Sequence, residues 1–558
     1  MDIDNRAEPK KETISIWYRE KWFSFLILGL VALAAVLVNI VWVVQDQSPP
    51  LWDIAGHSQR SLQISELMAN FKPRTILNLD TIYPPFSYIV TGTFFLIGGR
   101  HFDIPQISLL FWLLIYILSV YGIAHYLLKN RWLAILALAI SLFYPLLAHF
   151  SRIYDLDFPL TAMTMASLAA LIKSNGFKSR KWSILFGLAT ALAILTKWTA
   201  VVFILGPLIY ILIKSFKDKE SRKTKKINLV ILIAIILTLI APWYLTHAKD
   251  IWKSAQATRQ NIFSVPTEDL FSLDNIGYYV RKTVNSLTWP LAAWSLVGLF
   301  FFIKNRVKNG WFLLAWIVVP YLIMTFLFYS KESRYFLPVF PALAILAATS
   351  FWKVNRIWRH VGIGLILTMG VFVWTETSWG VKSFSDNIYE KLALSEEYGY
   401  KNVTYSDVRY GFTYPTQYHN NLEVVASALK TDLQQNKSEH NLIKIAVVPN
   451  SIFLSGQPVQ YWGRLLELES FNHDYQVDYA LSSRIRSTDW QEVITEADYL
   501  ITKTGDQGPA IWGKHLAEIA ESEKNGDPIF DNFELIQSWP LLGIEEDNQA
   551  VNLYRLIE

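Results

Sequence analysis

Four short stretches place charged residues beside apolar runs: Leu51-Trp52-Asp53, Ser151–Leu160, Thr196-Lys197-Trp198 and Lys331–Tyr335. Charges at the rim of a membrane span are usually paired, hydrated or functional. A partly desolvated carboxylate is suited to act as a general base. Lys and Arg side chains can bind an anionic lipid phosphate. Acids and bases around one lipid-facing cavity therefore predict group transfer from a lipid-phosphate donor.

The composition indicates a membrane protein. Of 558 residues, 52% are hydrophobic and 18% are charged, whereas soluble domains carry about 25% charged residues. Apolar runs long enough to cross a bilayer recur as far as Thr375 and then stop. The chain contains no cysteine, which excludes disulfides, thiolate metal sites and cysteine nucleophiles. We therefore predict a polytopic helical membrane protein followed by a soluble domain.

The basic loops set the predicted topology, because cytoplasmic loops carry an excess of Lys and Arg. These loops are Lys129–Arg131, Lys173–Lys181, Lys214–Lys226, Lys304–Lys308 and Lys353–His360. Placing all of them inside predicts about eleven spans, with the N-terminus in the cytoplasm. The predicted spans are Phe23–Val44, Pro105–Leu128, Trp132–Phe150, Phe158–Ile172, Trp182–Thr196, Trp198–Ile213, Ile227–Leu245, Leu287–Ile303, Trp311–Tyr329, Tyr335–Trp352 and Val361–Thr375.

The same parity divides the chain into regions. Residues 1–21 form a cytoplasmic tail, residues 22–378 form the transmembrane domain, and residues 45–104 form its first external loop. Phe86–Gly98 in this loop is too short for a span, and we expect it to lie along the outer interface. Residues 379–558 form a soluble domain outside the cytoplasmic membrane, on the external or periplasmic side.

Within residues 379–558, short apolar runs alternate with helical patterns. Such alternation is typical of an α/β domain. The predicted strands are Ile443–Val448, Val477–Leu481 and Tyr499–Thr502, and the predicted helices are Val459–Leu468, Asp489–Ala497 and Ala510–Glu523. The chain contains neither G-x-G-x-x-G nor G-x-x-x-x-G-K-[ST], so nothing indicates nucleotide binding.

The charged stretches carry a family resemblance. The motifs are Leu51-Trp52-Asp53 with Tyr83-Pro84-Pro85-Phe86, Arg152-x-Tyr154-x-x-Asp157-x-Pro159-Leu160, Leu195-Thr196-Lys197, and Lys331-x-x-Arg334-Tyr335-x-Leu337-Pro338-x-x-Pro341-Ala342. In this order, across residues 52–345, they resemble the GT-C glycosyltransferases. The branch is the one that contains protein O-mannosyltransferases and lipid A aminoarabinose transferases. This resemblance implies a GT-C-like fold with juxtamembrane helices in the first external loop.

The resemblance also implies an inverting sugar transfer from a polyprenyl-phosphate donor on the external face. Asp53 matches the first-loop aspartate that activates the acceptor, and a general base of this kind accelerates a reaction about 10²–10⁴-fold. Asp157, rather than Asp155, matches the second acid because it precedes the proline by two residues. We predict that Lys197, Arg334, Lys331 and Arg152 bind the donor phosphate. Tyr83, Tyr335 and Tyr154 are the predicted substrate-binding residues.

The chain departs from the aminoarabinose transferases at one motif. Those enzymes carry an acid–lysine pair directly before the two prolines, where this chain has Ile82-Tyr83. The phosphate contact expected there is absent, so their donor chemistry is not implied. His57 and His247 are expected outside, but neither lies in a matching metal motif. We assign no metal ligand, and a divalent metal stays an open alternative.

Structural readings stand beside the functional ones. Asp53 would also serve as the N-cap of a helix over Ile54–Asn70, and Asp157 as the N-cap of the span that begins at Phe158. Asp155 is expected to pair with Arg152. Lys197 and Arg334 would also serve as generic headgroup anchors, and Tyr83 as an interfacial anchor.

Two other functions compete with the glycosyltransferase. One is a transporter or flippase for an anionic lipid-linked substrate, which should show inverted repeats and ionisable groups near the membrane midplane. The other is an inactive relative whose external domain binds polymer. The candidate charges cluster at the exterior ends of spans, which favours an enzyme acting on a polyprenyl-phosphate-linked sugar in the bilayer. The acceptor is left open between a protein, a lipid and a wall glycan, and no feature indicates nucleic acid.

Overall fold

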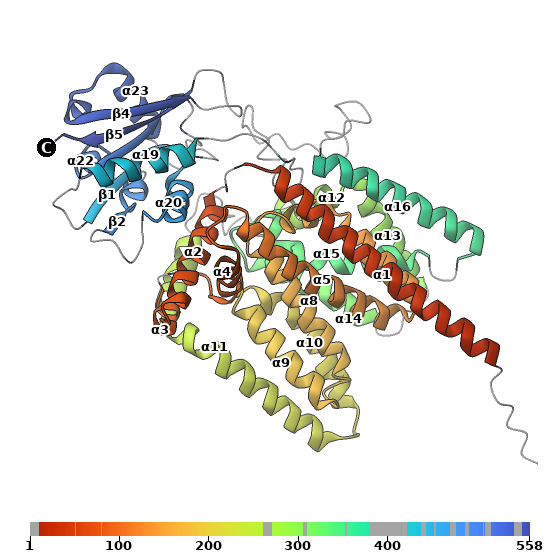
Figure 1. Cartoon of the computed structure of the whole chain (residues 1–558). Helices are drawn as coiled ribbons and strands as arrows, with labels where there is room; N and C mark the ends of the chain where they lie inside the picture. The colour runs from red at the N-terminus through yellow and green to blue at the C-terminus, as the bar shows by residue number, and fades with distance from the viewer. Residues whose placement is uncertain are drawn as a thin grey trace, which may run out of the picture.

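The computed structural model describes residues 11–48, 50, 52–79, 81–259, 270–304, 310–351, 354–379, 415, 421–436, 442–450, 454–468, 476–485, 490–505, 507, 515–540 and 549–557. Within them, a large helical bundle carries a smaller α/β unit at one end (Figure 1). Part of the first predicted external loop lies beside the α/β unit (Figure 1). The predicted mostly helical architecture is confirmed.

The bundle is built around α8. Its elements are α1 (Lys11–Gln45), α5 (Ile104–Leu128), α6 (Arg131–Leu142), α7 (Pro145–Phe150), α8 (Asp157–Lys173), α9 (Arg180–Ile194), α10 (Ala200–Lys217), α11 (Arg222–Arg259), α12 (Leu273–Leu287), α13 (Trp289–Lys304), α14 (Gly310–Phe326), the 3-10 helix η2 (Ser333–Val339), α15 (Phe340–Thr349) and α16 (Arg356–Trp379). Helix α8 is buried on nearly all sides and packs against α5, α9 and α10. A helix that is apolar all round belongs in an interior or in lipid.

Peripheral helices expose apolar side chains away from this interior. Examples on α1, α11 and α16 are Leu30, Leu37, Val230, Leu237, Leu365 and Val371. Among the described residues, five helices are long and apolar enough to cross a membrane, or six if the bent pair α12–α13 counts as one span. This agrees with a multi-pass membrane protein, and the count of about eleven spans stays a prediction.

Prolines divide several of the predicted spans. Trp132–Phe150 was expected to be continuous, but α6 ends at Leu142 and α7 begins at Pro145. Proline lacks a backbone N–H and clashes with the preceding helical turn, so it favours such a break. Tyr335–Trp352 likewise begins as η2, which contains Pro338, and continues as α15. Helices α12 and α13 meet at a bend of 115°.

The first predicted external loop folds into α2 (Trp52–Ala69), α3 (Pro73–Leu77) and α4 (Phe86–Gly98). The bounds of α4 coincide with the predicted interfacial segment. Helix α2 packs closely on α4 at Gly92, where an added Cβ would lie 3.1 Å from the Ser61 carbonyl oxygen and 3.2 Å from the Ser65 nitrogen. The close contact favours glycine, because a Cβ there would push α2 away from α4 by a few tenths of an ångström.

The C-terminal unit contains one five-stranded sheet with the order β2-β1-β3-β5-β4. Its strands are β1 (Leu442–Val447), β2 (Gln476–Asp478), β3 (Tyr499–Lys503), β4 (Phe533–Pro540) and β5 (Ala550–Leu556). Strand β1 pairs in parallel with β2 and β3, whereas β5 pairs antiparallel with β3 and β4. The helical elements are α19 (Leu422–Gln435), α20 (Gly456–Leu465), α21 (Leu481–Arg484), α22 (Trp490–Thr495), α23 (Leu516–Asn525) and the 3-10 helix η4 (Pro528–Asn532).

The predicted α/β character of this unit is confirmed. The predicted strands at Ile443–Val448 and Tyr499–Thr502 match β1 and β3 within a residue. The prediction for Val477–Leu481 was too long, because β2 ends at Asp478 and Leu481 begins α21. Strands β4 and β5 were not predicted. Part of the predicted helix Ala510–Glu523 lies outside the described residues, and α23 covers its second half.

Candidate active site

Four segments that are distant in sequence meet at one end of α8. They are the first turn of α2, the residues that lead into α8, the turn between α9 and α10, and η2. Asp157 is the first residue of α8, where the free backbone N–H groups and the helix dipole favour a negative charge. The backbone N–H of Phe86 donates to the Leu195 carbonyl at 3.0 Å, which ties the first loop to the turn that carries Lys197.

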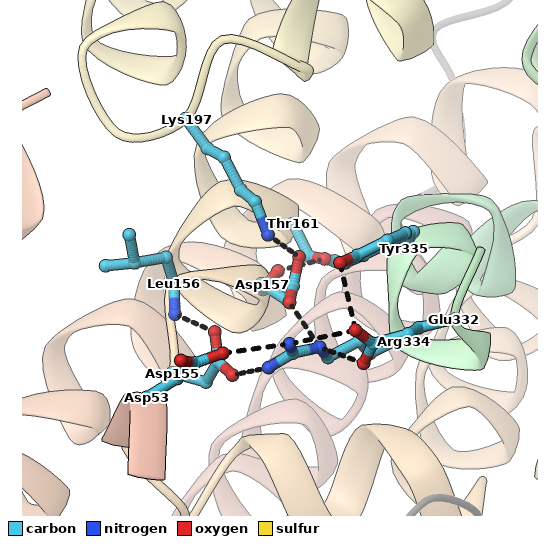
Figure 2. Close-up of polar contacts among 9 residues, drawn as sticks. All are labelled: Asp53, Asp155, Leu156, Asp157, Thr161, Lys197, Glu332, Arg334 and Tyr335. Carbon is cyan, nitrogen blue, oxygen red and sulfur yellow. Dashed lines mark hydrogen bonds and ion pairs between the residues drawn. The ribbon is translucent and has the colours of Figure 1, made fainter. Parts of the chain in front are cut away.

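Arg334 lies at the centre of this cluster (Figure 2). Its Nη1 donates to Oδ2 of Asp155, and its Nη2 lies 3.4 Å from Oδ2 of Asp53. Its Nε lies 2.8 Å from Oε2 of Glu332 and 3.7 Å from Oδ2 of Asp157. One guanidinium group therefore holds four carboxylates, which come from α2, from the segment that leads into α8, from the first residue of α8 and from the residue before η2.

Lys197 forms the second cationic contact. Its Nζ donates to Oδ1 of Asp157 at 2.7 Å, and the two side chains are only 7% and 1% exposed. The ammonium group also lies 5.1 Å from the Tyr335 ring centre and 5.7 Å from the Tyr83 ring centre. The Tyr335 hydroxyl donates to Oε1 of Glu332 at 3.0 Å. Burial by itself would lower the pKa of Lys197, but the Asp157 carboxylate raises it, so the lysine stays charged.

The aspartates differ in how firmly they are held. Asp155 is buried, and it accepts from the Leu156 backbone N–H and from Arg334. Burial alone would raise the pKa of Asp155, but Arg334 holds it well below its usual range. Asp53 is 61% exposed, and its contact with Arg334 is long at 3.4 Å. Asp53 is therefore the most exposed of the four carboxylates around Arg334 and the one with access from outside the bundle.

The structure brings six of the predicted site residues together: Asp53, Asp157, Lys197, Arg334, Tyr83 and Tyr335. Lys331 lies apart from them. Its Nζ donates to Oδ1 of Asn275 on α12 and to the Thr325 carbonyl of α14, the latter at 2.8 Å. Burial lowers the pKa of Lys331 to about 8. Its contacts hold the ends of two helices together rather than facing the carboxylate cluster.

Arg152 also lies elsewhere. It is 2% exposed, its Nε donates to Oδ1 of Asn39 at 3.0 Å, and its guanidinium group lies over the rings of Trp42, Trp374 and Trp379 at 5.5 to 5.7 Å. The predicted pair between Asp155 and Arg152 is wrong. The two residues belong to a bent segment between α7 and α8, so Arg152 points toward α1 and α16.

Tyr154 is fully buried away from Lys197 and Arg334. Its hydroxyl shares a 2.9 Å hydrogen bond with the Ser61 hydroxyl and ties the segment before α8 to α2. Neither aspartate is the N-cap of its helix, contrary to the structural alternative. Helix α2 begins at Trp52, so Asp53 lies inside its first turn. Helix α8 begins at Asp157, and its N-cap is Leu156.

Sequence reasoning missed two polar residues of the site. Glu332 contacts both Arg334 and Tyr335. His57 follows Asp53 by one helical turn, its Nδ1 lies 2.9 Å from the Tyr88 hydroxyl, and its ring packs edge-on against Tyr83. Burial lowers the pKa of His57 and keeps the imidazole neutral. The i, i+4 spacing of Asp53 and His57 was the available signal, because such residues share one helix face.

No group of three His, Asp or Glu side chains in the described part of the chain is arranged to hold a metal ion. The acidic residues nearest to one another are instead bound to Arg334 and Lys197.

Comparisons with known proteins agree with the resemblance seen in the sequence. The family model described as dolichyl-phosphate-mannose-protein mannosyltransferase matches residues 73–251. No curated protein sequence matches the chain. Among solved structures, ArnT from Cupriavidus metallidurans bound to undecaprenyl phosphate is 14% identical with a TM-score of 0.53, and the match covers 94% of this chain and 98% of that chain.

Two other solved structures are similar. The apo oligosaccharyltransferase of Archaeoglobus fulgidus is 11% identical with a TM-score of 0.52, covering 87% of this chain and 70% of that one. The arabinofuranosyltransferase AftD from mycobacteria is 13% identical with a TM-score of 0.52, covering 95% of this chain and 41% of AftD. The chain thus has the fold of the GT-C glycosyltransferases, and its resemblance to the protein O-mannosyltransferase and aminoarabinose transferase branch is confirmed.

Proposed function

We propose that the protein is a membrane glycosyltransferase that moves one sugar from a polyprenyl-phosphate donor to an acceptor hydroxyl on the external face. The observation that carries the proposal is the cluster at the start of α8, where an accessible aspartate lies beside two cations on a GT-C fold. ArnT, which shares this fold, is described as bound to undecaprenyl phosphate. That description supports a polyprenyl-phosphate lipid as the donor class.

In the proposed reaction, Asp53 takes the proton of the acceptor hydroxyl. The acceptor oxygen forms a bond to the anomeric carbon of the sugar, and the bond between that carbon and the phosphate oxygen breaks. Polyprenyl phosphate leaves with the bonding electrons, and a single displacement inverts the anomeric centre. Asp53 suits the role of base because Asp155 and Asp157 already accept from cations, whereas Asp53 is 61% exposed.

Lys197 is the proposed main contact for the leaving phosphate. An ammonium group has three donors, and Asp157 takes one of those on Lys197. The leaving phosphate gains negative charge as the bond breaks, and a fixed cation in a water-poor site stabilises that charge strongly. Tyr83 and Tyr335 flank the ammonium group and are the proposed walls for the sugar.

Arg334 has a linked role in this scheme. Before the reaction, Arg334 lies among four carboxylates, so the charge around its guanidinium group is mostly negative. When Asp53 accepts the proton, its carboxyl group becomes neutral and its 3.4 Å contact with Nη2 of Arg334 weakens. Nη2 keeps its 3.3 Å contact with Oε1 of Glu332, and its other N–H is then available to the phosphate as the phosphate becomes more negative. Proton uptake and leaving-group stabilisation are thereby coupled through one guanidinium group.

We also propose that residues 22–378 form the transmembrane domain and that residues 379–558 lie outside the membrane. Contact between α20 and α2 supports this arrangement, because it puts the C-terminal unit on the same side as Asp53. The N-terminus would then lie in the cytoplasm, as the basic loops require.

The test is to offer the purified protein, in lipid nanodiscs, a panel of radiolabelled polyprenyl-phosphate pentoses and hexoses with candidate acceptors. Transfer of label with release of polyprenyl phosphate is expected for one donor, and NMR of the product reports inversion. Movement of an intact labelled donor across the bilayer of sealed proteoliposomes, without release of polyprenyl phosphate, would instead establish a transporter and defeat the proposal.

A further inference from the structure

A buried ionic contact joins the C-terminal unit to α2. Nη1 of Arg464 on α20 lies 2.7 Å from Oε2 of Glu66 on α2, and the two side chains are 7% and 8% exposed. Arg100, from the chain that follows α4, places Nη2 3.0 Å from Oε1 of Glu66 and donates through Nη1 to the Arg464 carbonyl at 2.8 Å. Both carboxylate oxygens of Glu66 therefore form ion pairs with arginines from two different parts of the chain.

Apolar packing surrounds this contact. Ala55 and Leu62 of α2 form a buried cluster with Tyr461 and Leu465 of α20. The Phe102 and Trp462 rings stack with centres 5.5 Å apart, and the Tyr461 hydroxyl donates to the Phe102 carbonyl at 3.3 Å. Figure 1 shows α20 lying beside α2, at the edge of the C-terminal unit that faces the bundle.

Helix α2 thus has two faces that contact different parts of the protein. Ala55, Leu62 and Glu66 follow a helical spacing of seven and four residues and face α20. Asp53, His57 and Ser61 follow a spacing of four and four, and they face Arg334, Tyr88 and Tyr154 respectively. A displacement of α20 would therefore be transmitted through one rigid helix to Asp53, whose own side chain is held by the long contact with Arg334.

We propose that the C-terminal unit is a positioning element of the active site, and that Glu66, Arg100 and Arg464 are positioning residues that hold Asp53 in reach of the acceptor. The inference rests on the proposed glycosyltransferase function for its kinetic consequence. Its structural content, that α20 holds α2, is independent of turnover. A base displaced by about 1 Å can lose about 10²-fold in rate, so a contact some turns away from Asp53 is expected to change kcat.

The first test is hydrogen exchange of the full-length protein in lipid nanodiscs. Glu66→Gln keeps the side-chain volume but removes the charge, and Arg464→Gln removes the facing cation. Both are expected to speed amide exchange over residues 52–69 by about tenfold, while exchange in α8 stays unchanged. Arg464→Lys, which keeps the positive charge, should restore most of the protection. Arg484→Gln is the matched control, because Arg484 pairs with Glu496 inside the C-terminal unit at 2.7 Å.

The second test is kinetic. With the donor found by the panel, Glu66→Gln and Arg464→Gln should each lower kcat by about 10- to 100-fold, with the donor KM within about twofold of wild type. The double variant should lose no more than the more damaging single variant, because both remove the same contact. Equal exchange in wild type and variants, or a loss that appears in donor KM with kcat unchanged, would overturn the inference.

Failure of the two proposals can be told apart. Hydrogen exchange and the binding of undecaprenyl phosphate, used as the probe, need no turnover. A wild-type protein that transfers no sugar would defeat the proposed function. Unaltered exchange of α2 in Glu66→Gln, in a protein that does transfer sugar, would defeat the positioning role alone.

Discussion

Arg334 and Arg152 are both largely buried, but one is surrounded by carboxylates and the other by aromatic rings. Arg334 lies among four carboxylates and the ring of Tyr335, with Asp53 open to the outside. Arg152 lies among three tryptophan rings and Asn39, at the junction of α1 and α16. Only two residues separate Arg152 from Asp155, which is the partner of Arg334. A motif that is continuous in sequence is thus divided between a cluster of carboxylates and a packing contact.

The difference between these surroundings indicates what each arginine does. A guanidinium group over aromatic faces is stabilised without an anion of its own, which suits a structural joint between helices. A guanidinium group among carboxylates controls their charge and position, which suits chemistry. The predictions that follow are variants that separate the two surroundings, and each should be made in the full-length protein in lipid.

The largest effect is expected for Asp53→Asn. Loss of the base should lower kcat by about 10²–10⁴-fold, while binding of undecaprenyl phosphate stays within about twofold of wild type. Single-turnover transfer of the labelled sugar measures the first quantity, and lipid binding measures the second. Asp103→Asn is the matched control in the same loop, because the Asp103 carboxylate faces His101 at 3.6 Å and not the cluster. Full activity of Asp53→Asn would sink the assignment of the base.

Lys197→Met comes next. Methionine keeps much of the stem length but removes the donor, so the leaving phosphate loses its main cation and Asp157 loses its 2.7 Å partner. Transfer is expected to fall by about 10²–10³-fold, with weaker binding of undecaprenyl phosphate. Lys197→Arg should keep part of both. Unchanged lipid affinity in Lys197→Met would show that the phosphate binds elsewhere.

Arg152→Met should separate stability from activity. The variant loses the cation over three tryptophan rings and the hydrogen bond to Asn39, at a cost of about 1–3 kcal/mol of stability. Thermal inactivation should therefore occur at a lower temperature, while kcat and donor KM at low temperature match wild type. A raised donor KM would return Arg152 to the phosphate site that the sequence predicted.

The smallest effect is expected for Tyr154→Phe. The change removes one buried hydrogen bond to Ser61, worth about 1 kcal/mol, and leaves the ring packing intact. A small fall in the inactivation temperature with activity within about twofold of wild type is the expected result. A marked fall in kcat would indicate that this bond, like the α20 contact, helps to place α2.

Much of the fold could be predicted from local pattern. Apolar runs marked the helices of the bundle, and the bounds of α4 and α5 match the predicted segments within a residue. The breaks were harder, because Pro145 ended a run that composition alone made continuous. Strand β4 was missed because its exposed residues blur the apolar signal, as its burial pattern shows. Strand β5 is largely buried, but Asn552 and Arg555 interrupt its apolar run. Pairing across the sheet, rather than local composition, defines them.

The amino-acid sequence alone determined which residues are available, including the acids, the two cations and the prolines that interrupt the helices. It also carried the resemblance to GT-C enzymes. Tertiary structure decided which charges meet. Asp53 and Arg334 are separated by 281 positions along the chain, and no local rule predicts a contact at that range. It also decided that Arg152 points to α16 while Asp155 points to η2. Neighbouring side chains in a bend can face opposite sides, and the packing of distant helices selects the partner of each.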